Sequence, residues 1–111
     1  MDVNRLRFYH NPRCSKSRQA LSLLIDRGVE FEEYRYLERG VHMDDFEILA
    51  NLPDVIRKSD VFEKEKYDFE DVESIKELIR SQPKCVQRPI LVSGGEAVIG
   101  RPPENILILL L

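Results

Sequence analysis

Cysteine and histidine are scarce in this chain, which has only two of each: Cys14, Cys85, His10 and His42. Two cysteines are too few for the disulfide framework of a small secreted domain, so we expect both thiols to be free. The cysteines and histidines also show no recognised metal-ligand spacing. The sequence therefore predicts neither a disulfide scaffold nor a metal site.

Long hydrophobic runs are missing as well. No apolar run follows a basic segment near the N-terminus, which argues against a signal peptide. The apolar stretch 106–111 is far too short to span a bilayer. We therefore expect no membrane association and a cytoplasmic location. The formal net charge of -3 argues against non-specific binding to nucleic acid.

The composition is that of an ordinary globular protein. Of 111 residues, 42% are hydrophobic and 33% are charged, and no internal repeat or low-complexity tract interrupts them. This length allows one hydrophobic core without disulfides or metals. We expect a single domain over residues 1–111.

The most informative stretch is 9–18, where a short apolar strand (6–9) runs into a turn and then a helical pattern with Cys14 at its start. A thiol in this position is close to unpaired N–H groups and to the positive end of the helix dipole. Three nearby cations add positive charge: Arg13, Lys16 and Arg18. These conditions favour a reactive thiolate and suit a tetrahedral oxyanion. The alternative is a small buried cysteine with no chemical role.

The next segments predict a parallel βαβ unit. Apolar residues at helical spacing indicate a helix over 14–27, which Gly28 ends. The aromatic-rich segment 31–37 is typical of a strand. A helical connection of this length joins parallel strands, and it places Cys14 at the end of the first strand.

The middle of the chain predicts short helices. One has Phe46, Leu49 and Ala50 on its buried face, and Pro53 can open another through Arg57. The acidic segment 60–73 is interpreted as a surface loop or short helix anchored by three aromatic side chains: Phe62, Tyr67 and Phe69. An amphipathic helix follows over 72–79 and ends before Pro83.

The last quarter predicts a β-hairpin and a final helix. The apolar strand 88–92 is followed by Gly94-Gly95, a two-residue hairpin signal, and by a returning strand at 97–99. A helix then opens at 101–104. The whole order is βαβ–ββα, which indicates an α/β fold of the thioredoxin-like kind. It would have a four-stranded mixed sheet and a helical insertion at about 42–82.

Three motifs together resemble the glutaredoxin-dependent arsenate reductase (ArsC) family. They are YHNPRCSKSR at 9–18, RPILV at 88–92 and GRPPE at 100–104. The motifs occur in the order found in that family, and the resemblance extends over nearly the whole chain. The family is thioredoxin-like, in agreement with the order of elements.

The resemblance implies a role for each matching residue. Cys14 would attack arsenate and form a covalent cysteine–arsenic adduct, with His10 supporting the thiolate. Three arginines would bind the anion: Arg57, Arg88 and Arg101. Asn11, Ser17 and Pro89 would be structural residues near the site, with Pro89 matching a cis-proline. Glutathione would be the co-substrate and glutaredoxin the protein partner, with no bound cofactor.

Other interpretations remain open from the residues alone. The alternative role of Arg57 is an ion pair with Asp54 or Asp60. The alternative role of Arg101 is an interaction with Glu104. Cys85 lies outside the matching motifs and is either incidental or a resolving thiol. The segment 60–73 departs from the family pattern.

Two other functions also stay open. One is a redox-sensing regulator that binds RNA polymerase, as the related Spx-type proteins do. Many Spx-type proteins carry a Cys-x-x-Cys pair at this position, where this chain has Cys14 and Ser17. The other is a thiol-dependent reductase that acts on a different substrate.

Overall fold

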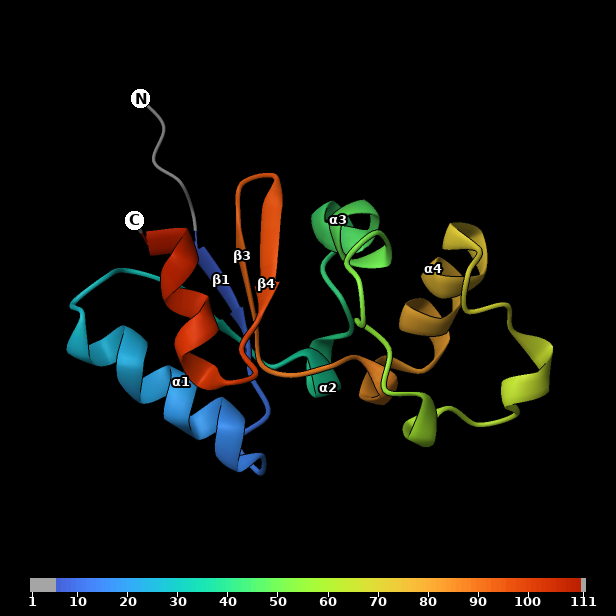
Figure 1. The fold of residues 1–111 in the computed structure, drawn as a ribbon, viewed down its shortest axis with the longest axis horizontal. Coiled ribbons are helices and arrows are strands. Elements are labelled where there is room, and N and C mark those ends of the chain that lie inside the picture. Colours follow the sequence, from blue (N-terminus) through green and yellow to red (C-terminus); the bar gives the residue numbers. More distant parts are fainter. Residues whose placement is uncertain (1–5, 111) are drawn as a thin grey trace. The chain divides into compact units, whose positions relative to one another are not determined.

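Strand β1 (Leu6–Tyr9) begins the described part of the computed structural model, which covers residues 6–110. By their internal contacts the residues form two units (Figure 1). The first unit contains the segments up to Arg35 and from Arg88 onward, and the second is Tyr36–Gln87. The predicted insertion at about 42–82 lies inside the second unit.

The first unit is built on a four-stranded sheet in the order β2-β1-β3-β4. Its other strands are β2 (Glu32–Tyr34), β3 (Ile90–Ser93) and β4 (Glu96–Ile99). β1 pairs with β2 in parallel, whereas β1–β3 and β3–β4 are antiparallel. This arrangement confirms the predicted thioredoxin-like fold with a mixed sheet.

Two helices complete the first unit. α1 (Ser15–Asp26) and the C-terminal 3₁₀ helix (Pro103–Leu110) contact each other, as Figure 1 shows for the blue and red ribbons. The core residues between helices and sheet have no solvent exposure: Phe8, Ala20, Leu24, Leu91 and Ile106. Removal of these apolar side chains from water is the main force that holds the two helices on the sheet.

α1 lies within one residue of the predicted bounds 14–27 at each end, because its ends carry clear local signals. Cys14 is the N-cap and Arg27 the C-cap. Gly28 follows with φ of 67°, a left-handed conformation that glycine adopts without steric cost. The hairpin prediction is also confirmed: Ser93 pairs with Glu96, so Gly94-Gly95 forms the two-residue turn.

The predicted strand at 31–37 is too long. The paired residues end at Tyr34, and Tyr36–Arg39 forms a short helix, α2. The pairing with β1 stops at Tyr9 opposite Tyr34, and the His10 N–H makes the last bond to the Tyr34 carbonyl at 2.9 Å. The final helix also differs from the expectation in its type, since its residues form 3₁₀ turns.

The second unit contains α2, α3 (Phe46–Ala50), α4 (Val72–Ser81) and several 3₁₀ turns. Val61, Leu78 and Cys85 form its buried cluster, and three partly buried side chains pack against them: Ile56, Tyr67 and Phe69. α4 follows the predicted amphipathic pattern and is capped by Asp71, which accepts from the Ser74 N–H at 3.3 Å.

Two predictions for this unit are wrong. The helix expected through Val55–Arg57 does not form, because Ile56 makes an antiparallel bridge with Val86. The Arg57 N–H also donates to the Cys85 carbonyl at 2.7 Å, which holds this backbone extended. The second is the anchoring role of Phe62. Its side chain is 70% exposed and is not among those packed against the buried cluster, whereas Tyr67 and Phe69 are.

Within residues 6–110, no helix has the length and apolar character needed to cross a membrane.

Candidate active site

Cys14 lies between β1 and α1, at the mouth of the helix. Its N–H donates to the Asn11 carbonyl at 2.9 Å, and its carbonyl accepts from the Arg18 N–H at 3.0 Å. The first bond closes the turn after β1, and the second begins the helix. The Cys14 side chain is partly exposed, so its sulfur is accessible to a small reactant. The alternative of a sealed, structural cysteine does not fit this position.

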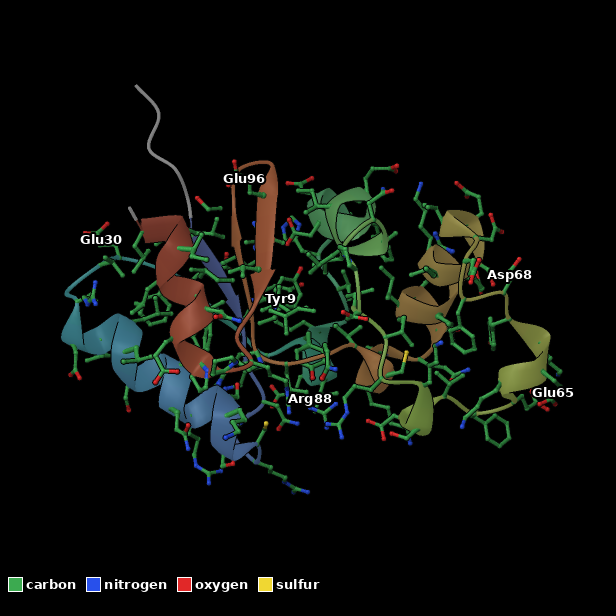
Figure 2. The ribbon with its side chains drawn as sticks, in the orientation of Figure 1. Tyr9, Glu30, Glu65, Asp68, Arg88 and Glu96 are labelled. Carbon is green, nitrogen blue, oxygen red and sulfur yellow. The ribbon has the colours of Figure 1, made fainter. Side chains whose placement is uncertain are left out.

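Arg101 is the side chain that reaches the sulfur. Its Nη2 lies 3.6 Å from Cys14 Sγ, and its Nε donates to the Arg88 carbonyl at 2.8 Å. Arg88 contributes a second positive charge near the thiol, and Figure 2 shows it on the side of the sheet where α1 begins. The positive charges of two of the three predicted anion-binding arginines therefore both stabilise negative charge on this sulfur.

These surroundings favour the thiolate form of Cys14. Burial alone would raise the pKa of this thiol. The backbone N–H groups of Ser17 and Lys16 oppose that effect, and the charges of Arg101 and Arg88 add to them, so the net pKa lies below the ordinary value. Main-chain donors and guanidinium groups thus stabilise the negative charge of a Cys14 thiolate.

His10 and Ser17 form a buried pair between the end of β1 and the first turn of α1. The His10 ring Nδ1 lies 2.7 Å from Ser17 Oγ, and this hydroxyl also accepts from the Asn11 N–H at 3.0 Å. The ring stacks on Phe8 with centroids 5.5 Å apart. Burial lowers the pKa of His10. The negative charge of Glu33 raises this pKa, and the positive charges of Arg35 and Arg18 lower it further. These contacts tie the end of β1 to the first turn of α1.

The strand register brings two distant loops to this site. Tyr9 pairs with Ile90, and Ile90 pairs with Ile99. The residues that follow Tyr9, precede Ile90 and follow Ile99 therefore lie at the same end of the strands. There the Gly100 N–H donates to the carbonyl of Pro89 at 2.8 Å. The Arg88–Pro89 peptide bond is cis, as the resemblance implied for Pro89, and the Arg101–Pro102 bond is cis too.

Gly100 is a residue that the sequence reasoning did not single out. A Cβ atom here would lie 2.9 Å from Pro89 Cγ and 3.0 Å from Ile106 Cγ2. Only a glycine allows this close approach of the two loops. The sole signal in the sequence was its place before Arg101 in the GRPPE motif.

Arg57 and Cys85 belong to the second unit. Arg57 Nε lies 3.6 Å from Asp60 Oδ2, which is one of the ion pairs considered as an alternative. Its role toward an anion stays a prediction. Cys85 is fully buried, and burial raises the pKa of its thiol to about 11, with a further contribution from Asp60. A thiol of this kind is poorly suited to act as a nucleophile.

The arrangement around Cys14 can carry out nucleophilic attack on an oxyanion. The thiolate provides the nucleophile, and the cationic donors beside it can hold the oxygens on which charge develops. Guanidinium groups suit this task because their planar N–H donors match the oxygens of tetrahedral anions.

Comparisons with known proteins find similarity over nearly the whole chain. The ArsC family model matches residues 9–109. The uncharacterized protein YfgD of Escherichia coli (strain K12) is 39% identical over 114 residues, covering 95% of this chain and 96% of that protein. An arsenate reductase of Neisseria meningitidis serogroup B is 36% identical over 110 residues, covering 91% of this chain and 94% of that protein.

One solved structure and one regulator extend the comparison. The structure of an arsenate reductase from Vibrio cholerae superposes with a TM-score of 0.79 at 30% identity, covering 96% of this chain and 98% of that one. The regulatory protein MgsR of Bacillus subtilis (strain 168) is 26% identical over 110 residues, covering 92% of this chain and 87% of that protein. With the family model spanning all three motifs and the fold matching at this level, the chain belongs to the ArsC family.

Proposed function

We propose that this protein reduces arsenate to arsenite, with Cys14 as the nucleophile and with glutathione and glutaredoxin as electron donors. The observation that carries the proposal is the contact of Arg101 Nη2 with Cys14 Sγ at 3.6 Å, at the N-terminus of α1. The arsenate reductases among the relatives support the choice of substrate.

The proposed reaction begins with attack of the Cys14 thiolate on arsenic. A sulfur–arsenic bond forms, and one arsenate oxygen takes up two protons and leaves as water, so arsenic remains As(V). Arg88 and Arg101 hold the remaining oxygens while their charge grows. Fixed donors aimed at such oxygens lower the barrier, since they need no reorganisation during the step.

Two thiols then supply the two electrons. A glutathione thiolate replaces a second oxygen of the adduct, which also leaves as water. A glutaredoxin thiolate attacks the glutathione sulfur and forms a mixed disulfide, and the electron pair of the broken sulfur–arsenic bond reduces arsenic to As(III). Water finally cleaves the bond between Cys14 and arsenic, which releases arsenite and restores the thiol.

The test is arsenite production by the purified protein with arsenate, glutathione and glutaredoxin. We expect turnover in the wild type and in Cys85→Ala, and none in Cys14→Ser. The Cys85 variant is the matched control, because it removes the other thiol of the chain. An inactive wild type with every thiol donor tested would contradict the proposal, and so would an active Cys14→Ser protein.

A regulatory function is the second candidate, since MgsR is among the relatives. The residues around Cys14 speak against a disulfide switch of the Cys-x-x-Cys type. Ser17 stands in the second position, where its hydroxyl is buried against His10 and Asn11. Capture of RNA polymerase subunits from cell extract by the wild-type protein would favour the regulatory function.

A reductase with another substrate is separated from arsenate reduction in one coupled assay. Arsenate and a small disulfide are compared as substrates for the same preparation. We expect arsenate to be consumed the faster. Efficient turnover of the disulfide without arsenate turnover would identify a thiol-disulfide reductase instead.

A further inference from the structure

Asn105 lies in the first turn of the C-terminal 3₁₀ helix, four residues after Arg101. Its side-chain Nδ2 donates to the Arg101 carbonyl at 3.1 Å. Its backbone N–H donates to the carbonyl of Pro102 at 3.0 Å. These two bonds close the turn that begins at Arg101, so the main chain of Arg101 is tied to the helix that follows.

The side chain of Arg101 is fixed at a second point. Its Nε donates to the Arg88 carbonyl at 2.8 Å, and Nη2 then faces Cys14 Sγ at 3.6 Å. A guanidinium group is planar, so the bond made by Nε sets the direction in which Nη2 points. Whether Nε reaches the Arg88 carbonyl depends in turn on where the Arg101 main chain is held.

We propose that Asn105 is a positioning residue for Arg101, and through Arg101 for the thiolate of Cys14. The Asn105 amide fixes the main chain of Arg101 through its hydrogen bond. The fixed main chain places the Arg101 guanidinium beside the Cys14 sulfur. Asn105 itself makes its side-chain bond to a backbone oxygen and acts through Arg101. The inference deepens the proposed function, but its effect on the thiolate requires no arsenate.

The chain contains a matched control for this contact. Asn51 Nδ2 donates to the Glu47 carbonyl at 2.8 Å, which is also a bond from an asparagine side chain to the carbonyl four residues earlier. Asn51 belongs to the second unit. Both amides make the same type of backbone bond, and Asn105 is the one linked to Arg101.

The experiment measures the rate of alkylation of the full-length protein by iodoacetamide as a function of pH. Replacement of Asn105 by Ala is expected to move the midpoint for Cys14 upward by up to about 0.5 pH unit, and by less than the loss of Arg101 itself, because the guanidinium stays in the protein but is held less firmly beside the sulfur. Asn51→Ala is expected to leave the midpoint unchanged. Cys14→Ser identifies the labelled site, since Cys85 is buried with a pKa raised to about 11.

A double variant tests whether Asn105 acts through Arg101. In an Arg101→Ala background, Asn105→Ala should cause no further shift in the midpoint. An upward shift that persists in that background would overturn the proposal. So would a single variant that lowers the melting temperature and leaves the midpoint in place, because that result describes a purely structural asparagine. If Asn105→Ala does not fold, Asn105→Ser removes the same bond with a polar side chain.

Arsenate turnover separates this inference from the proposed function. If the midpoint shifts as expected and the wild type does not reduce arsenate, the positioning role stands and the assigned reaction fails. If the wild type reduces arsenate and the midpoint does not move, the positioning role fails and the reaction stands.

Discussion

At Cys14, burial and positive charge act on the same sulfur in opposite directions. Burial raises the pKa of the thiol, while the Ser17 and Lys16 N–H groups and two arginines lower it by a larger amount. The helix mouth and a neighbouring guanidinium are the usual means by which proteins activate a cysteine. The pKa of this thiol therefore depends on donors from separate parts of the chain.

Removal of Arg101 should affect both the thiol and the reaction. In Arg101→Ala we expect the midpoint of Cys14 alkylation to rise, because a cation at 3.6 Å from Sγ is lost. Arsenate turnover should fall by about 10²–10³-fold, the usual cost of removing one donor from a developing oxyanion. The measurements are the pH dependence of alkylation and the steady-state rate of arsenite formation.

Arg27→Ala is the control for this variant. Arg27 is an exposed arginine at the other end of α1, so it changes the net charge by the same amount. An equal effect of both variants would show that Arg101 acts only through overall charge, and our account of the site would then be wrong.

At the scale of elements, the site exists where two loops meet the start of α1. The loop before β3 carries Arg88 and Pro89, and the loop after β4 carries Gly100 and Arg101. Two bonds join them: one from the Gly100 N–H to Pro89 and one from Arg101 Nε to Arg88. The pairing of β3 with β4 holds the loops within reach of each other.

Gly100→Ala should push these loops apart. The new Cβ would lie 2.9 Å from Pro89 Cγ and 3.0 Å from Ile106 Cγ2, in a buried position. We expect a loss of about 1–3 kcal/mol in the free energy of unfolding, as for other overpacked sites. Denaturant unfolding measures this loss, and the alkylation midpoint of Cys14 should rise in the same variant.

Gly95→Ala serves as the comparison for Gly100→Ala. Gly95 lies in the exposed hairpin turn, and a Cβ there meets nothing within 4 Å. Its unfolding free energy should change by less than about 0.5 kcal/mol. Similar losses at both glycines would indicate a general effect of backbone stiffness instead of a close contact at Gly100.

At the scale of the whole molecule, buried His10 links stability to pH. Because burial lowers its pKa below 6.5 in the folded state, the unfolded chain binds a proton at a pH where the folded chain does not. The contribution of this neutral ring to stability is complete above pH 6.5 and is lost as the pH falls below that value. Stability should therefore decrease as the pH falls from about 7 through 6.5.

Replacement of His10 by Gln should flatten that decrease. The measurement is the free energy of unfolding of wild type and variant across this pH range. A wild-type slope in the His10 variant would mean that other groups set the pH dependence.

The local elements of this protein follow from its sequence because their signals are local. The apolar period and Gly28 define α1, and Gly94-Gly95 defines the hairpin turn. The position of Cys14 at a helix mouth depends on the same signals, so its place in the fold and the mixed sheet could be predicted. The segment 55–57 could not, because Ile56 takes its conformation from a partner 30 residues away.

Tertiary structure alone decided which cations reach the sulfur. Arg101 lies 87 positions after Cys14 in the chain, and strand register together with a close contact at Gly100 places its guanidinium there. Arg57 lies outside the three sequence motifs and pairs with Asp60, and its role toward an anion stays a prediction. A residue type and its neighbours in sequence determine what chemistry a side chain can perform. Its partner depends on long-range strand pairing, which no local pattern encodes.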